Sequence, residues 1–408
     1  ACKVVAELKY TEDFITQKSG NSVAVIPLKP LKPKTNYLLV MTDNLMDDAG
    51  FPIAGSSSYE LVRQDITTHP LGSEDQLGLQ ATINSYEKAI IAAGVEEDSI
   101  IYTASITTQS TVDVLGTHKN LLAAQVQAGQ YPVIAVTDLG LNVADIIGSQ
   151  IPPSLVPLYS TANFMQGTIT LPYYLGIPSA ENPMAPVNDW WKSLCDSGAM
   201  LAGLAASNPG AIPTDPISPS DAQCMAVSEA GGLPWPGLRD LGIDTDRHLT
   251  KYSPVPKTTM ADEIVVQMTT PDLTMVNAVR ASMGLPAISE PAAGWPVVML
   301  QHGITSKKED MLAITGIFSL YGLATAAINH PLHGDPNVFG GNPLLDAGSR
   351  GFDLTGNGQD DISASTVSAT HYLNLGSLVT ARDNLRQSTA DTLGLRLGLN
   401  FVVGNHIE

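Results

Sequence analysis

The sequence predicts a β-rich module followed by a larger α/β domain that contains parallel strands. Short runs of β-branched and aromatic residues fill positions 1–65, which is typical of strands. Further along, the apolar run Val297–Leu300 ends in the glycine turn Gln301–Thr305, and a helical segment then leads to a second apolar run at Leu323–Ile328. The order strand, turn, helix, strand is typical of two neighbouring parallel strands.

Length and composition limit the function classes. The 408 residues exceed one ordinary core, so we expect two or three domains. Hydrophobic residues make up 44% and charged residues 15%, which indicates a globular chain. The formal net charge of −19 disfavours nucleic acid as a partner, because a phosphate backbone would be repelled. It does not exclude a lipid or ester substrate that is met through an apolar lid. No apolar run is long enough for a membrane span.

Residues 1–65 are interpreted as an immunoglobulin-like β-sandwich module, because proline, asparagine and glycine separate runs of strand character. Residues 66–150 then alternate between helical and strand spacing and are interpreted as a connecting α+β segment. The runs expected to form strands in the first module are Val4–Leu8, Ser22–Ile26, Tyr37–Thr42 and Tyr59–Arg63.

Residues 151–408 are predicted to begin an α/β domain with an insertion at about 177–258. Strand-like runs at Gly167–Leu175 and Ala261–Thr269 flank this stretch, which is rich in proline, glycine and tryptophan. The two strands fit the antiparallel start of a larger sheet, with the insertion as a cap or lid. A proteolysable surface loop is the alternative interpretation of the insertion.

Two features of the insertion suggest specific roles. Trp190, Trp191 and Trp235 could form an apolar lid face for lipid, with packing inside the insertion as the alternative. Cys195 and Cys224 lie in the same loop-rich segment and are predicted to form a disulfide. Closing that loop would contribute about 3–4 kcal/mol to stability. A disulfide also points, weakly, to an oxidising compartment.

The turn after Val297–Leu300 is the candidate for chemistry. Gly303 lets the backbone turn sharply, and the following amide N–H groups would face a crevice at the carboxyl end of the strand. Acyl transfer creates a negatively charged oxygen that such fixed donors stabilise. Ile304 is the predicted donor through its backbone, and His302 supports the loop or is purely structural.

Two neighbouring patterns have weaker implications. Ser306–Glu309 has the form of a capping box that would begin a helix. The apolar face of that helix would consist of Met311, Ile314, Ile317, Phe318 and Tyr321. His330 and His333 stand in a second histidine–glycine turn after the next strand. They are expected to be structural, because a metal site would need further ligands.

Oxygen-bearing residues surround Gly358 in a pattern like the first half of a Ca²⁺ loop. Asp353, Asn357 and Asp361 are the candidate ligands, whereas Ala364 stands where a bidentate glutamate is expected. A solvated Asp/Gly turn is therefore the preferred interpretation, with a Ca²⁺ loop as the alternative. The predicted chemistry requires no cofactor, and Ca²⁺ is the only ion for which the sequence gives a pattern.

Several motifs together resemble the bacterial virulence-factor type of extracellular lipase. The matching motifs are Pro27–Leu31, Gly167–Leu175, Gly294–Val298, Gln301–Ser306, His330–Gly334, Asn374–Leu378 and Arg382–Gln387. One position departs from the family pattern: Asn329 stands where an acidic residue is expected before the second histidine–glycine turn, which removes a carboxylate that could order the loop.

The resemblance implies an α/β-hydrolase fold and a lipase or esterase that uses Ser-His-Asp chemistry. Its substrates would be acylglycerols, phospholipids or short acyl esters. It also implies secretion or association with the outer-membrane surface of a Gram-negative bacterium. Cys2 after Ala1 is similar to the end of a lipoprotein cleavage site, although an ordinary strand cysteine is the alternative. No obligate protein partner is inferred.

The serine nucleophile of such an enzyme is not found. No serine has glycine both two positions before and two positions after it, as a nucleophile elbow requires. Leu373–Leu397 is expected to be the helix before the nucleophile strand, which places the nucleophile and the triad beyond Glu408. We therefore expect an incomplete hydrolase sheet and a fragment that is inactive alone.

Two other classes of function stay open. One is a surface binding or adhesion protein with a vestigial hydrolase domain. The other is a peptidase or thioesterase on the same fold, since a fold does not determine a substrate.

Overall fold

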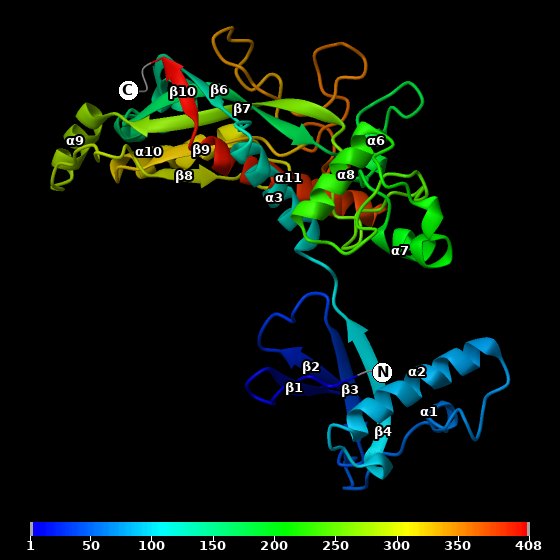
Figure 1. Cartoon of the computed structure of the whole chain (residues 1–408). Helices are drawn as coiled ribbons and strands as arrows, with labels where there is room; N and C mark the ends of the chain where they lie inside the picture. The colour runs from blue at the N-terminus through cyan, green and yellow to red at the C-terminus, as the bar shows by residue number, and fades with distance from the viewer. Residues whose placement is uncertain (1–2, 406–408) are drawn as a thin grey trace. The chain divides into compact units, whose positions relative to one another are not determined.

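The computed structural model describes residues 3–405, which form two compact units that divide between Val112 and Asp113 (Figure 1). The predicted boundaries at 65 and 150 differ from this division. Strand β4 (Ile100–Thr107) pairs within the first unit, whereas β5 (Ile134–Asn142) joins the large sheet of the second. The segment 66–150 is therefore shared between the units. Cys2 lies outside the described residues.

Unit 1 contains two separate antiparallel strand pairs, β1 with β2 and β3 with β4. Its described residues form no sheet of more than two strands, so the sandwich expected for 1–65 is not observed there. No strand forms at Val4–Leu8. The other elements are β1 (Phe14–Ser19), β2 (Ser22–Pro27), β3 (Asn36–Thr42), α1 (Ser57–Val62) and α2 (Glu74–Ile91).

The strand predicted at Tyr59–Arg63 is wrong, because these residues lie in and just after helix α1. The Ser56 side chain accepts a hydrogen bond from the Tyr59 N–H and so caps the helix. The Tyr59 side chain is buried, and its hydroxyl donates to Glu87 at 2.7 Å. Arg63 Nε also lies 3.2 Å from Glu87. Local strand propensity is thus overridden by the cap and by these contacts with α2.

Unit 2 is built on a six-stranded mixed sheet with the order β10-β5-β6-β7-β9-β8. The pairs β8–β9 and β10–β5 are parallel, and the other pairs are antiparallel. The parallel pairing predicted for the two apolar runs is therefore present, although the sheet as a whole is mixed. Besides β5, its strands are β6 (Ala162–Tyr173), β7 (Met260–Pro271), β8 (Val297–Leu300), β9 (Ala324–Ala327) and β10 (Val402–Asn405).

Helices cover both faces of this sheet. Successive side chains of a strand point to opposite faces. On β6, Met165 packs in the core cluster that includes Leu395 of α11 (Leu378–Gly398), whereas Phe164 packs with Leu312 of α10 (Leu312–Leu320). The two helices therefore lie on opposite faces. The remaining α-helices are α3 (Asp113–Gln127), α4 (Val143–Ile147), α5 (Val156–Tyr159), α6 (Ala185–Asn188), α7 (Gly198–Ser207), α8 (Pro219–Ala230) and α9 (Leu273–Ser282).

The edge of the sheet differs from the sequence-based expectation. An unbroken apolar run such as Val297–Leu300 is typical of a strand buried on both faces. Strand β8 is instead an edge strand in which Val297 is 42% exposed. The buried face of helix α10 also differs from the apolar face predicted from the sequence. Ile317 and Tyr321 are exposed, whereas Gly316 lies against the backbone of Leu158, where an added Cβ would be 2.8 Å from the Leu158 carbonyl oxygen.

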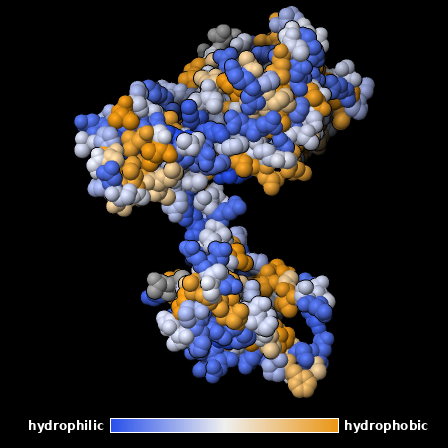
Figure 2. All heavy atoms as spheres, turned by 90° about the vertical axis from the view of Figure 1, so that its right-hand side faces the viewer, coloured by the Kyte–Doolittle hydropathy of each residue, from blue (hydrophilic) through white to orange (hydrophobic). Residues whose placement is uncertain are grey.

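Exposed apolar side chains form several patches on the surface of each unit (Figure 2).

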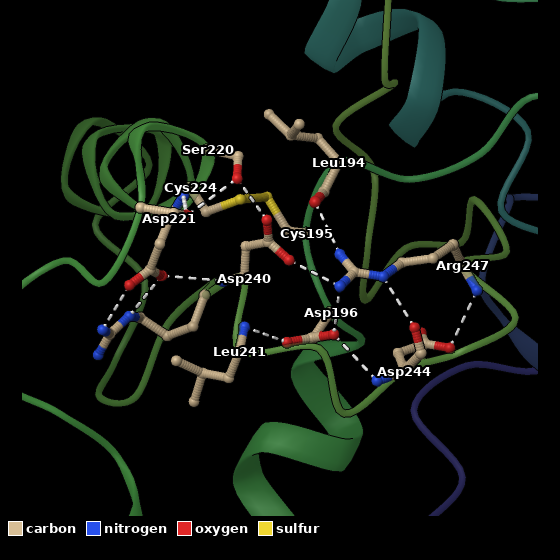
Figure 3. A network of polar contacts seen from close by, with 12 residues as sticks. Leu194, Cys195, Asp196, Ser220, Asp221, Cys224, Asp240, Leu241, Asp244 and Arg247 are labelled. Carbon is tan, nitrogen blue, oxygen red and sulfur yellow. Dashed lines mark hydrogen bonds and ion pairs between the residues drawn. A yellow bond between two sulfur atoms is a disulfide. The ribbon is translucent and has the colours of Figure 1, made fainter.

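The expected antiparallel strands β6 and β7 pair along their whole length, and the insertion joins Tyr173 to Met260. The predicted disulfide between Cys195 and Cys224 is present, with Cα atoms 5.8 Å apart. Nearby, the buried carboxylate of Asp221 receives two hydrogen bonds from the Arg239 guanidinium, at 2.8 and 2.7 Å (Figure 3).

A second buried carboxylate organises the other half of the insertion. Asp196 accepts hydrogen bonds from the Leu241 and Asp244 N–H groups and lies 3.0 Å from Arg247 (Figure 3). These bonds and the disulfide tie distant parts of the insertion together, which favours an ordered cap over a loose loop.

Among the described residues, no helix is both long and apolar enough to cross a bilayer.

Removal of the disulfide should destabilise unit 2. We expect the double substitution Cys195→Ala and Cys224→Ala to lower its free energy of unfolding by about 2–5 kcal/mol. Denaturant unfolding followed by tryptophan fluorescence measures this, because all 4 tryptophans lie in unit 2. Cys2→Ala is the control, and an equal effect of the control would contradict the prediction.

Candidate functional site

The two histidine–glycine turns lie side by side at the carboxyl ends of β8 and β9. This follows from the parallel pairing of the strands, which ends at Leu300 and Ala327. The rings of three histidines pack together: the centroid of His302 is 4.5 Å from that of His330 and 5.1 Å from that of His333. Both turns predicted from the sequence thus belong to one site.

Each turn contributes a histidine ring that accepts a hydrogen bond from the backbone of the other turn. His302 Nε2 accepts from the His330 N–H at 3.0 Å, and His333 Nε2 accepts from the Thr305 N–H at 3.1 Å. The Nδ1 atoms lie 2.8 Å from the carbonyl oxygens of Gly303 and Pro331. This network assigns both rings as neutral, with the proton on Nδ1.

Burial keeps these histidines neutral. It lowers the pKa of His333 to about 4 and, together with the two neighbouring rings, lowers the pKa of His330 to about 3. Burial also lowers the pKa of His302. The loop-supporting role expected of His302 agrees with this geometry, and His333 has the matching role on the other turn.

The backbone after β8 offers free donors. Within residues 3–405, the N–H groups of Gly303 and Ile304 form no hydrogen bond. The space beside Gly303 is open, because a Cβ there would meet no atom within 4 Å. The next residue, Thr305, has a φ of 71°, which a β-branched residue rarely adopts. Such fixed, unpaired N–H groups can stabilise an oxyanion.

A small cavity lies beside the turns, with about 50 Å³ of space for water-sized molecules. This is enough for a few waters and too small for an ester. Gly303 and Ile304 are not among its lining residues. The lining residues come from the ends of β8 and β9 and from α11: Met299, Leu300, Gln301, Ile328, Asn329, His330, Ser388, Asp391, Thr392 and Leu395.

Asn329 orders the second turn with its amide. Its Oδ1 accepts from the Lys308 N–H at 2.8 Å, and its Nδ2 donates to the Gly348 carbonyl at 3.0 Å. The carboxylate expected from the sequence is absent, but the amide of Asn329 orders the loop in its place. An amide supplies both a donor and an acceptor, whereas a carboxylate has only acceptors.

Sequence reasoning missed Arg350, the central cation of this region. Its buried guanidinium lies 2.7 Å from Asp262 of β7 and 2.8 Å from Asp391 of α11, and it donates to the Asn329 carbonyl at 2.8 Å. The two carboxylates raise its pKa although burial opposes this. No local pattern around Gly348 could reveal it, because its partners are far away in the chain.

The capping box predicted at Ser306–Glu309 does not form. Asp310 Oδ2 instead accepts from the Ser306 hydroxyl at 2.6 Å and from the Lys307 N–H at 3.2 Å. Glu309 is buried and pairs with the buried Lys308 ammonium. The carboxylate one position later therefore caps this turn, since Glu309 is needed to neutralise Lys308.

The three tryptophans expected on a lid do not share one environment. Trp191 is fully buried, which fits the packing alternative, whereas Trp235 is 64% exposed. Trp190 is half-buried and stacks on His248 with the centroids 5.4 Å apart, and Lys192 Nζ lies 3.5 Å from its ring centre. Only Trp235 presents a largely exposed apolar surface.

The loop that contains Asp353, Asn357 and Asp361 uses its side-chain oxygens for bonds within itself. The Asp353 carboxylate accepts from backbone N–H groups, including that of Gly358 at 2.7 Å. Asp361 Oδ2 accepts from the Leu354 N–H at 2.8 Å, and Asn357 Oδ1 from the Gln359 N–H, also at 2.8 Å. Since the oxygens serve their own loop, the structure favours the Asp/Gly turn. No cluster of at least three His, Cys, Asp or Glu suits a metal in the described part of the chain.

Comparison with known families gives one match. Residues 1–136 match the family described as bacterial virulence factor lipase N-terminal. This supports a lipase-type relationship and agrees with the family that the sequence motifs resemble. The match covers one third of the 408 residues and includes unit 1, α3 and the start of β5. The candidate site lies outside it. No curated protein and no solved structure matches the chain.

Unit 2 should lose stability as the pH falls from about 6.5 to 4. Burial lowers the pKa of His118 and of His333 to about 4 each, so the unfolded chain binds protons that the folded chain does not. The lowered pKa of each histidine reduces the free energy of unfolding by about 2 kcal/mol at pH 5. Denaturant unfolding at pH 7 and pH 5 measures the loss. His118→Gln should reduce the pH dependence, and an unchanged pH dependence in this variant would contradict the prediction.

Arg350→Met should destabilise unit 2 by about 3–5 kcal/mol, because Asp391 would stay buried without a cation. Adding Asp391→Leu should recover part of the loss. Arg396→Met, at an exposed position on the same helix as Asp391, is the control. Thermal unfolding of the four proteins measures this, and equal effects of both single variants would refute it.

Proposed function

We propose that this chain supplies the oxyanion-binding side of a carboxylic ester hydrolase of the lipase type, built on an α/β-hydrolase sheet. The observation that carries the proposal is the turn after β8, where the N–H groups of Gly303 and Ile304 lack partners within residues 3–405. This turn follows a strand that pairs in parallel with β9. Acyl transfer needs such donors beside the reacting carbonyl.

Three further observations support the proposal. The lipase N-terminal match covers residues 1–136. The strands β6 and β7 pair in antiparallel before the parallel pair, as expected for the start of a hydrolase sheet. The insertion between them is cross-linked and exposes Trp235, which fits a cap that meets an apolar substrate.

The nucleophile of the proposed reaction comes from outside these residues. The sequence has no Gly-x-Ser-x-Gly, the motif that a nucleophile elbow requires. In the proposed mechanism, the turn N–H groups bind the ester oxygen as it becomes negative. A serine that these 408 residues do not supply would attack the carbonyl carbon and pass its proton to a histidine held by an aspartate.

We also propose an exported protein that acts on lipid or short acyl esters, based on the virulence-factor lipase match and the disulfide. An adhesion protein with an inactive hydrolase domain is the second candidate. Reading the coding sequence on both sides of these residues separates the two. A frame without a Gly-x-Ser-x-Gly in the following strand–helix elbow would favour adhesion.

Ile304→Pro should lower kcat on p-nitrophenyl acyl esters by about 10²–10³ in the protein that carries the nucleophile, because proline has no N–H. Ile304→Val keeps the donor and should have little effect. Circular dichroism checks that both variants are folded. Equal losses in the two variants would show that the turn matters only for packing, and peptide cleavage without ester cleavage would refute the lipase assignment.

A further inference from the structure

We propose that His333 is a positioning residue: its neutral ring accepts the Thr305 N–H and so holds the β8 turn in the shape that presents the Gly303 and Ile304 donors. The inference deepens the proposed oxyanion function and rests on it for its catalytic meaning. The hydrogen bond itself can be tested without any enzymatic activity.

The first argument is backbone strain. Thr305 has a φ of 71° and Leu332 a φ of 59°, so each turn holds one bulky residue in the left-handed region. Such a conformation persists only where surrounding contacts impose it. The bond from the Thr305 N–H to His333 Nε2, at 3.1 Å, acts at the strained residue itself. His333 is therefore placed to impose the conformation.

The second argument is that the His333 ring has one available orientation. Its side chain is fully buried, its Nδ1 lies 2.8 Å from the Pro331 carbonyl, and the ring of Tyr372 packs against it at 4.8 Å. The backbone is fixed as well, because the Arg350 N–H donates to the His333 carbonyl at 2.8 Å. The acceptor atom Nε2 is thus directed at Thr305.

The third argument concerns charge around the ring. The groups that face the cluster are mostly neutral or cationic: His302, His330, Tyr372, Arg350 and Lys308, with Asp310 acting only on His302. A proton on His333 Nε2 would point at the Thr305 N–H, and two donors cannot bond. Burial lowers the pKa of His333 to about 4, so the bond persists at neutral pH and is lost in acid.

A separate connection limits this loss to the turn. The Ser365 hydroxyl donates to the Ser306 carbonyl at 2.8 Å and accepts from the Gly334 N–H at 3.1 Å. This pair of bonds joins the same two turns and contains no group that titrates in this range. Protonation of His333 should therefore release Thr305 without separating the strands.

The test is amide hydrogen exchange of the 408-residue chain, expressed as protection relative to the intrinsic rate at each pH. His333→Leu should lower the protection of the Thr305 amide by about tenfold at pH 7, the effect of one lost hydrogen bond. His333→Gln has an acceptor oxygen near the position of Nε2 and should preserve the protection. It should also abolish the loss of Thr305 protection near pH 4 that we expect in the natural chain beyond the loss at the amides of β8 and β9.

The matched control is His302→Leu, which should expose the His330 amide instead of the Thr305 amide. Equal Thr305 protection in the natural chain and in His333→Leu would overturn the proposal. So would a loss of Thr305 protection in acid that, relative to the amides of β8 and β9, is as large in His333→Gln as in the natural chain. If exchange behaves as expected but Ile304→Pro retains esterase activity, the positioning bond exists and the proposed function fails. If Ile304→Pro is inactive but the His333 variants leave Thr305 exchange unchanged, the proposed function stands and the positioning role of His333 fails.

Discussion

The buried Arg350 guanidinium is the interaction on which the candidate site depends. A cation removed from water must be compensated almost completely, and two carboxylates and a carbonyl from three parts of unit 2 do this. These contacts fix the position of Arg350 against β7 and α11, and the Arg350 N–H donates to the His333 carbonyl. The position of the second turn, and through it that of the first, therefore depends on the buried Arg350 guanidinium.

Local order along the chain predicted the part of the fold that carries the site. The strand, turn, helix, strand sequence between Val297 and Ile328 identified the parallel pair β8–β9 and the turn with Gly303. It could not reveal that β8 lies at the sheet edge or which face of α10 is buried, since both depend on distant neighbours. Tyr59 shows the same limit, because its helix is selected by a cap and by contacts with α2.

The candidate site also combines residues that a local sequence pattern predicted with contacts that it could not predict. Gly303 and Ile304 were found because a glycine at the end of an apolar strand is a local signal. The bonds that support them join Thr305 to His333 across 28 positions and Arg350 to Asp391 across 41. The spacing of apolar residues along the chain does not predict contacts between residues so far apart. The role of Asn329 could not be predicted for a related reason, because the Lys308 N–H and the Gly348 carbonyl that its amide binds are distant in the sequence.

The way in which the insertion joins the sheet has a consequence for how such proteins diversify. Tyr173 and Met260 are paired neighbours on β6 and β7, so the chain leaves and re-enters the sheet at one point. A module grafted between paired residues imposes no change of register, and this one brings its own cross-link and ion pairs. Evolution can therefore enlarge, shrink or replace it while the scaffold beneath stays the same.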